Sequence, residues 1–226
     1  MLAPRKKLWS TPTEILDVAS SWMQLQPNDK VVDIGCGDGR VLIHLAAHWT
    51  ALYNKEKKDE VSESEQSLLS VSFVGLDINL ERIKEASSAL KNAQQDGRVH
   101  SALSIKFYCA NAMDSKDLYQ DATLFFLYLI PRGLKIFKPI LLEILRERCE
   151  KRMAASGAGD SGNSSNNKGV LRVLTYMSPL PEEVFLKRQV CEVAHQPGAA
   201  WPVFLYHLDE ECLPPIEEAD YSNTKI

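Results

Sequence analysis

Residues 31–40 read VVDIGCGDGR, an apolar run that ends in three glycines at every second position. The apolar run predicts a short β-strand over residues 30–34, and apolar residues at helical spacing predict a helix over residues 38–49. Glycines between a strand and a helix let the backbone turn sharply and let a ligand approach closely. The amides at the start of the helix are free to bind an anionic group. The run therefore predicts a ligand-binding loop at the carboxyl end of a strand.

β-type runs alternate with helical periodicities along the rest of the chain. The last two β-type runs have no helix between them, which predicts an antiparallel pair. Strands that alternate with helices indicate a mostly parallel sheet covered on both faces. The predicted fold class is α/β: a Rossmann-like three-layer sandwich with a mostly parallel seven-stranded sheet and an antiparallel C-terminal edge strand. The further strands are predicted at residues 71–76, 103–108, 122–129, 170–177, 185–193 and 203–208, and the further helices near 80–90 and 134–150.

The length of 226 residues suits one domain with a single core. A helix is predicted within residues 10–29, with a threonine cap at Thr11, a proline in the first turn and an acid near the positive end. Two polar stretches and the acidic end of the chain lack any periodicity. The predicted organisation is one domain over residues 1–226, with flexible insertions at 53–70 and 154–168 and a frayed tail at 214–226.

Composition excludes several classes of function. The net charge of −4 provides no global basic field, so no nucleic-acid partner is expected. Five scattered cysteines without a CxxC pair predict free thiols in a reducing compartment. The apolar runs fall short of the ~20 residues that a membrane helix needs, so no membrane segment is predicted. The basic start at residues 1–7 lacks a following apolar core, which predicts an intracellular, cytoplasmic location, with a short mitochondrial presequence as the alternative.

Two acids, Asp33 and Asp38, accompany Gly35 and Gly37 in the glycine loop. The spacing is GxGxG and differs from the GxGxxG of dinucleotide-binding loops. A pyrophosphate would be repelled by the two acids, whereas the ammonium group of a methionine moiety would be attracted. The loop therefore favours S-adenosylmethionine over NAD as the cofactor. For Asp38 the alternative is stabilisation of the helix start without any ligand.

The ends of the next two strands carry further polar residues. Asp77 and Ile78 follow the second strand, and Asp77 is placed to accept both ribose hydroxyls, a role that an NAD site shares. Asn111 and Ala112 follow the third strand, where an asparagine could reach the adenine amino group. The alternatives are helix capping for Asp77 and turn stabilisation for Asn111.

The runs VVDIGCGDGR, GLDIN (75–79) and CANAMD (109–114) resemble the class I, seven-stranded S-adenosylmethionine-dependent methyltransferases over about residues 10–208. WSTPT (9–13), DIGCGDGRVL (33–42) and FLYLIP (126–131) resemble the small protein-lysine methyltransferase family acting on the mitochondrial ADP/ATP carrier and ATP synthase c subunit. The two polar insertions depart from that family, and its animal members carry a hydrophobic segment before the domain. The resemblance implies an S-adenosylmethionine site formed by Asp33, Gly35, Gly37, Asp77, Asn111 and Ala112, with Trp9 and Thr11 closing over the methionine end.

The fourth strand ends where many amino-methylating relatives carry an Asn/Asp-Pro-Pro-Tyr motif. Here a single proline, Pro131, remains, with Tyr128 three residues before it. The resemblance implies that Leu127 contributes to the cofactor site and that Tyr128 and Pro131 line the channel of the methyl acceptor. An apolar channel would favour the neutral amine that a lysine acceptor needs. For Tyr128 the alternative is a tyrosine that merely completes an apolar strand.

The predicted function is an S-adenosylmethionine-dependent methyltransferase (EC 2.1.1.-) that acts on a protein lysine. The alternatives are a methyltransferase for a small molecule or nucleic acid, a non-catalytic binding module on the same fold, and an NAD oxidoreductase. His44 and His48 stand four residues apart, but no HExxH pattern accompanies them, so no metal site is predicted.

Overall fold

The computed structural model describes residues 10–56, 70–156, 169–194, 198 and 200–214. These residues contain a seven-stranded sheet in the order β3-β2-β1-β4-β5-β7-β6. The strands are β1 (Lys30–Ile34), β2 (Ser72–Asp77), β3 (Ser104–Cys109), β4 (Leu124–Leu127), β5 (Leu171–Tyr176), β6 (Lys187–Glu192) and β7 (Ala200–Leu208).

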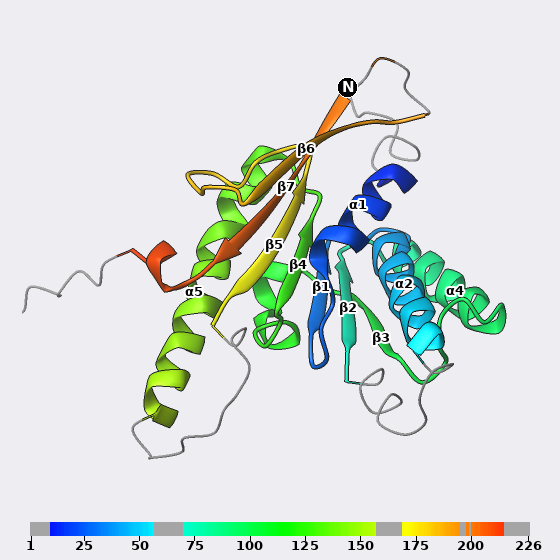
Figure 1. Cartoon of the computed structure of the whole chain (residues 1–226), viewed down its shortest axis with the longest axis horizontal. Helices are drawn as coiled ribbons and strands as arrows, with labels where there is room; N and C mark the ends of the chain where they lie inside the picture. The colour runs from blue at the N-terminus through cyan, green and yellow to red at the C-terminus, as the bar shows by residue number, and fades with distance from the viewer. Residues whose placement is uncertain (1–9, 57–69, 157–168, 195–197, 199, 215–226) are drawn as a thin grey trace, which may run out of the picture.

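Helices cover both faces of the sheet (Figure 1). One face is covered by α1 (Thr13–Met23), α2 (Arg40–Glu56) and α4 (Leu80–Gln95), and the other by α5 (Pro131–Ser156). Three short 3₁₀ turns complete the described elements: η1 (Ala112–Asp114), η2 (Lys116–Leu118) and η3 (Glu210–Cys212). The predicted three-layer α/β sandwich is confirmed.

The first five strands run parallel, and β7 runs antiparallel to both of its neighbours, β5 and β6. The expected antiparallel C-terminal pair is confirmed; the strand that opposes the others is β7, one place in from the edge strand β6. In register, Ile34 lies opposite both Leu76 of β2 and Leu127 of β4. The carboxyl ends of these three strands therefore meet at one edge of the sheet.

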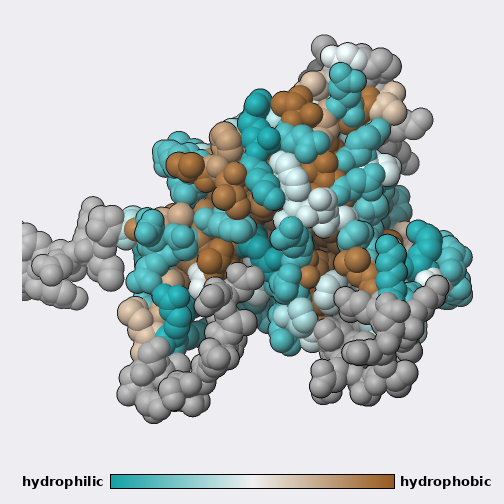
Figure 2. Space-filling view, viewed as in Figure 1, coloured by the Kyte–Doolittle hydropathy of each residue, from teal (hydrophilic) through white to brown (hydrophobic). Residues whose placement is uncertain are grey.

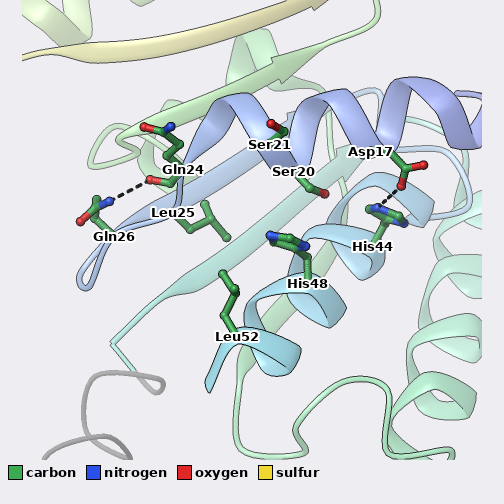
Figure 3. Close-up of a pocket in the computed structure, with 9 residues that line it drawn as sticks. All are labelled: Asp17, Ser20, Ser21, Gln24, Leu25, Gln26, His44, His48 and Leu52. Carbon is green, nitrogen blue, oxygen red and sulfur yellow. Dashed lines mark hydrogen bonds and ion pairs between the residues drawn. The ribbon is translucent and has the colours of Figure 1, made fainter. Parts of the chain in front are cut away.

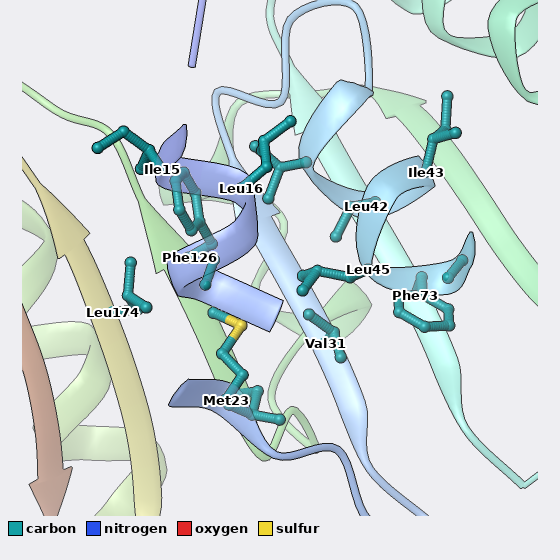
Figure 4. Close-up of a cluster of buried hydrophobic side chains, with 14 of the residues drawn as sticks. Ile15, Leu16, Met23, Val31, Leu42, Ile43, Leu45, Phe73, Phe126 and Leu174 are labelled. Atoms are coloured by element: carbon teal, nitrogen blue, oxygen red, sulfur yellow. The ribbon is translucent and has the colours of Figure 1, made fainter. Parts of the chain in front are cut away.

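The sheet separates two hydrophobic clusters. Figure 4 shows part of the cluster beneath α1 and α2, in which Phe126 of β4 packs with Ile15 and Leu42. The neighbouring Phe125 and Leu127 point to the opposite cluster, beneath α5. Successive β4 side chains are thus buried on both faces of the sheet, which explains the uninterrupted apolar run at this strand.

The structure corrects two local predictions. The residue that caps α1 is Pro12, in extended conformation, and its carbonyl accepts the amides of Ile15 and Leu16; the predicted threonine cap was wrong. The predicted insertions over residues 53–70 and 154–168 both begin too early: α2 continues to Glu56, with Tyr53 only 5% exposed, and α5 continues to Ser156.

Several other predictions fall largely outside the described residues. Residues 57–69 and 157–168 of the two predicted insertions lie there, as do residues 215–226 of the predicted tail.

All five cysteines lie inside the described part and are free thiols, as predicted. In the same part of the chain, no helix combines the length and apolarity needed to cross a membrane.

Candidate active site

The glycine loop lies at the point where the strand order reverses. The chain passes from β1 outward to β2 and β3, and then returns to β4 on the other side of β1. In open α/β sheets ligands bind in the crevice at such a reversal, beyond the carboxyl ends of the strands. The amides of Gly35 and Cys36 donate to the carbonyl of Leu76 at 2.8 and 2.9 Å, which holds the loop against the end of β2.

The loop glycines have the backbone conformation that their residue type permits. Gly35 and Gly37 have φ values of +78° and +55°, in the left-handed region where a side chain would be strained. A β-carbon on either glycine would still have room, since its nearest heavy atoms would lie 3.8 Å away at Gly35 and 3.6 Å away at Gly37. Backbone conformation, rather than lack of space, therefore explains these two glycines.

Asp77 joins the loop to the end of β2. Its Oδ2 accepts the amide of Gly37 at 3.0 Å, and its Oδ1 accepts the amide of Asn79 at 2.8 Å. The cap of α4 is Asn79, whose side chain accepts the amides of Glu81 and Arg82. The capping role considered for Asp77 thus belongs to Asn79, and the carboxylate of Asp77 faces the glycine loop.

A largely apolar pocket of about 330 Å³ opens beside Asp77. Its volume is at the lower end of the range of about 300–1,000 Å³ that is common for small-molecule sites. Five of the predicted site residues line it: Gly35, Asp77, Ile78, Asn111 and Ala112. The other lining residues are Ile34, Leu76, Ala110, Met113, Leu129, Gly133, Ile136 and Phe137.

Gly35 also lines a second, polar hollow of only about 30 Å³, which has room for one or two water molecules. It gathers further predicted residues, namely Thr11, Asp33, Gly37, Asp38 and Tyr128. Gly35 lines both spaces, so the apolar pocket and the polar hollow adjoin at the loop. The polar hollow is completed by Ser10, Cys36, Arg40, Val41, Arg82 and Phe126.

Asp33 is a buried acid without a bonding partner among the described residues. It is 2% exposed, and no hydrogen bond or ion pair joins its carboxyl group to that part of the chain. Burial, followed by the charges of Asp77 and Asp38, raises its pKa to about 8. A buried carboxyl group in this state would be stabilised as a carboxylate by a cation entering the polar hollow.

Asp38 differs from Asp33, because Arg40 neutralises it. The Nε of Arg40 donates to both oxygens of Asp38 at 2.9 and 3.0 Å, and Nη2 lies 2.5 Å from Oδ2. Burial would raise the pKa of Asp38, but the hydrogen bonds and charge of Arg40 outweigh it and lower this pKa. The structure therefore places Asp38 at the hollow but leaves Asp33 as the acid that can receive a cation.

Asn111 lines the apolar pocket while it stabilises a turn. Its Oδ1 accepts the amide of Met113 at 3.2 Å, which caps η1, and its Nδ2 donates to Asp114 at 2.6 Å. The turn-stabilising role considered for Asn111 is therefore present, and the contact with adenine stays a prediction. Ala112 is held in place by the Tyr119 hydroxyl, which donates to its carbonyl at 2.5 Å.

The three site residues predicted at the end of β4 do not lie together. Tyr128 lines the polar hollow; its hydroxyl donates to Sδ of Met177 at 3.0 Å, and its ring centroid lies 4.6 Å from that of Tyr176. Burial raises the pKa of Tyr128. Leu127 is 0% exposed in the core beneath α5 and lines neither space. Pro131 is exposed at the start of α5 and also lines neither.

Trp9 lies outside the described residues, whereas Thr11 is 4% exposed and lines the polar hollow. Sequence reasoning missed Arg40, although it stands two residues after Asp38, a spacing that allows a local ion pair. It also missed the apolar walls formed by Met113, Leu129 and Ile136. Met113 follows the predicted Ala112 directly, and Ile136, which is 48% exposed, lies outside the core face that Leu134, Phe137 and Leu141 form on the same helix.

Another hollow, of about 630 Å³, lies between α1 and α2 and shares no lining residue with the two spaces at the glycine loop (Figure 3). His44 and His48 project into it from α2, and His44 Nε2 lies 3.3 Å from an oxygen of Asp17 on α1. Burial lowers the pKa of His44. Within the described residues no group of three histidine, cysteine or acidic side chains is arranged to hold a metal ion.

Comparison with known proteins places the fold. No protein-family model matches the sequence, and no curated protein matches it. Among solved structures, an RNA methyltransferase from Salinibacter ruber in complex with S-adenosyl-L-homocysteine is similar with a TM-score of 0.57 and 18% identity, over 91% of this chain and 97% of that chain. An S-adenosylmethionine-dependent O-methyltransferase from Thermotoga maritima has a TM-score of 0.52 and 14% identity, over 89% of this chain and 67% of that chain. The chain therefore has the Rossmann-like fold of these methyltransferases.

Proposed function

We propose that this protein is an S-adenosylmethionine-dependent methyltransferase. The observation that carries the proposal is Asp33: a buried acid without a bonding partner in the described chain, placed in a polar hollow beside an apolar pocket. S-adenosylmethionine has an apolar adenine at one end and a cationic ammonium at the other, which matches the two spaces in chemistry and order. The likeness of fold to two methyltransferases supports the same assignment.

Three parts of the chain would hold the cofactor. Ile78, Met113 and Ile136 provide apolar walls for the adenine, and Asp77 offers its remaining lone pairs to the ribose hydroxyls. Asp33 would pair with the ammonium group of S-adenosylmethionine, whereas it would repel the pyrophosphate of NAD. NAD is therefore disfavoured at this loop.

The bound cofactor supplies a methyl group on a sulfonium, which is already a good leaving group. The protein then contributes alignment of the acceptor and exclusion of water. Tyr128 lines the hollow next to Gly35, which supports a place for it beside the acceptor, and its raised pKa keeps its hydroxyl neutral. Tyr128 thus orients an acceptor, and a neutral phenol is not a general base.

For the acceptor we propose a lysine side chain of a protein. The resemblance of residues 9–13, 33–42 and 126–131 to protein-lysine methyltransferases supports it. A second support is the segment between β5 and β6, where Val184, Phe185 and Leu186 are 89%, 45% and 56% exposed. Figure 2 shows apolar surface in the area of β6 and β7. Adjacent exposed apolar side chains are typical of protein-binding surfaces.

The first experiment tests the cofactor by calorimetry with S-adenosylhomocysteine and with NAD. We expect binding of S-adenosylhomocysteine alone, and its loss or strong weakening in Asp77→Ala. Glu81→Ala, which removes an exposed acid of α4 close by in the sequence, is the matched control and should bind as the wild type does. Equal binding of NAD, or unchanged binding by Asp77→Ala, would contradict the proposed site.

The second experiment identifies the acceptor. Purified protein and S-adenosylmethionine are added to a cell extract, and peptides are searched by mass spectrometry for added methyl groups on lysine. An Asp33→Asn sample provides the background. Methylated lysines that depend on Asp33 support the proposal; methyl transfer to RNA or to small molecules alone would replace the lysine acceptor by one of those classes.

A further inference from the structure

The polar hollow is too small for the group that it is proposed to receive. Its 30 Å³ holds one or two water molecules, whereas the adjoining apolar pocket has about 330 Å³. An amino-acid tail that pairs with Asp33 cannot enter unless part of the wall moves outward. Adenosine without such a tail meets no comparable obstacle, because the apolar pocket takes none of its lining from the segment before α1.

Ser10 and Thr11 line the hollow, and Pro12 connects them to α1. Thr11 is 4% exposed, and the carbonyl of Pro12 is held by the first turn of α1. We call residues 10–12 the strap. A displacement of the strap would open the hollow without disturbing the sheet, since the strap contributes no strand.

One side chain joins the strap to the glycine loop. The guanidinium of Arg40 donates to both oxygens of Asp38 through Nε and Nη2, while its Nη1 donates to the carbonyl of Thr11 at 3.5 Å. The bond to Thr11 is long, so it can break at small cost. The pair with Asp38 is short and charge-assisted, and it fixes the guanidinium beside the strap.

We propose that Arg40 is a latch that holds the strap closed over the polar hollow and so controls access for ligands that carry an amino-acid tail. It is a positioning residue: it acts on the strap and leaves the ammonium of the ligand to Asp33. The inference rests on the proposed function, because the tail is that of S-adenosylmethionine or its product. Adenosine enters the apolar pocket first, and the tail follows when the latch releases.

The test compares two ligands that share adenosine and differ in the tail. S-adenosylhomocysteine carries the amino-acid tail, and 5′-methylthioadenosine does not. Association and dissociation rates are measured by stopped flow for the wild type, Arg40→Ala and Arg40→Lys. In Arg40→Ala we expect both rates for S-adenosylhomocysteine to rise about fivefold, the size expected for loss of one hydrogen bond to the strap. The rates for 5′-methylthioadenosine should stay unchanged.

Arg40→Lys keeps the positive charge but loses the planar fork, so its rates should lie between those of the wild type and Arg40→Ala. Arg98→Ala is the matched control, since Arg98 also pairs with an acid two residues earlier, Asp96, at 3.1 Å on an exposed turn. Arg98→Ala should leave the association and dissociation rates of both ligands unchanged. A merely structural role of Arg40 in the loop would shift the rates of both ligands together.

The outcomes separate the latch from the proposed function. If S-adenosylhomocysteine and 5′-methylthioadenosine both bind but Arg40→Ala and Arg40→Lys leave the ratio of their association rates unchanged, the latch is wrong and the site stands. If neither ligand binds the wild type, the proposed function fails and the latch fails with it. Circular dichroism of each variant verifies folding, and Arg40→Lys decides the question if Arg40→Ala does not fold.

Discussion

The carboxyl group of Asp33 destabilises the folded protein while it prepares the site for a cation. Its pKa is about 8 in the folded chain against an ordinary value of 3.8, so the folded state binds this proton more tightly than the unfolded state does. The contribution of this group to the stability of the folded protein is therefore fully present below pH 4. It is lost as the pH rises toward 8, where the buried group ionises. Above that pH an unpaired buried carboxylate remains.

Asp33→Asn should therefore stabilise the ligand-free protein, and by more at pH 8 than at pH 5. The amide has nearly the same size and cannot ionise, so we expect a gain of about 2 kcal/mol in the free energy of unfolding at the higher pH. Urea unfolding at the two pH values measures it. Asp96→Asn, at an exposed turn, should show no such difference; a loss of stability in Asp33→Asn at pH 8 would contradict the strained state of this acid.

The same titration should appear in ligand affinity. Below pH 8 Asp33 must release its proton before it pairs with an ammonium group, so affinity for S-adenosylhomocysteine should rise with pH by up to about tenfold per unit and then level off near 8. Calorimetry from pH 6 upward measures the affinity, and buffers of different ionisation enthalpy report the released proton. 5′-Methylthioadenosine lacks the ammonium and should bind independently of pH. An equal slope for both ligands would assign the titration to another group.

For single residues, the sequence predicted which acids lie near the glycine loop better than it predicted which groups they bond. Asp33, Asp38 and Asp77 were all predicted as acids of the site, and each lines one of the two spaces at the glycine loop. Their division of labour depends on side-chain geometry: Arg40 neutralises Asp38, backbone amides satisfy Asp77, and Asp33 has no partner among the described residues. No spacing rule distinguishes these outcomes, because each depends on where a neighbouring side chain folds.

At the scale of elements, one aromatic ring determines how closely β2, β3 and α2 approach. Phe107 of β3 lies against Gly75 of β2 and Gly39 before α2; a β-carbon on either glycine would come within 2.6 Å of the ring. Gly39 also has a φ of +74°, whereas Gly75 is a glycine for lack of space alone. The glycine in GLDIN therefore serves packing behind the site, and the site residue of that run is Asp77.

Gly75→Ala should destabilise the protein by about 1–3 kcal/mol, because the added methyl group overlaps the Phe107 ring and Cys36 Sγ. In a Phe107→Leu background the same substitution should cost at least about 1 kcal/mol less, since the smaller side chain leaves room. Urea unfolding of the four proteins gives the coupling energy. Gly97→Ala, whose β-carbon would meet nothing within 4 Å, is the control whose cost should not depend on residue 107. A coupling near zero at Gly75 would contradict the role of the ring.

The limits of prediction at this scale follow from strand ends and helix faces. The apolar run at residues 122–129 predicts β4, but the strand ends at Leu127. Leu127 consequently stays in the sheet and points into the core, while Leu129, beyond the strand, turns toward the apolar pocket. Pro131 is similarly used to start α5. Because the strand stops two residues before the end of the apolar run, Leu129 rather than Leu127 faces the pocket, and periodicity does not resolve where a strand stops.

Across the whole molecule, the end of the sheet opposite the site is held by one buried ion pair. Arg172 at the start of β5 contacts both oxygens of Asp29 at 2.5 and 2.6 Å and donates to the carbonyl of Met23 at 2.7 Å. Thr123, just before β4, donates to Asp29 at 2.7 Å. Residues from α1, the turn before β1 and the starts of β4 and β5 thus meet at Asp29. The sequence showed the alternation that builds the layers, but it offered no sign that a strand arginine would join them.

Arg172→Met should lower the free energy of unfolding by about 3–5 kcal/mol, because it leaves the 5%-exposed Asp29 charged and without its cation. Arg172→Met combined with Asp29→Asn should recover part of that loss, since the neutral amide has no charge to bury. Affinity for 5′-methylthioadenosine should stay at the wild-type value in both variants, because the apolar pocket lies at the carboxyl ends of the strands and takes no residue from α1. Urea unfolding and calorimetry on the same samples separate the two effects. A weaker affinity at unchanged stability would show that Arg172 acts on the site; the reverse pattern assigns it to the framework that holds α1 against the sheet.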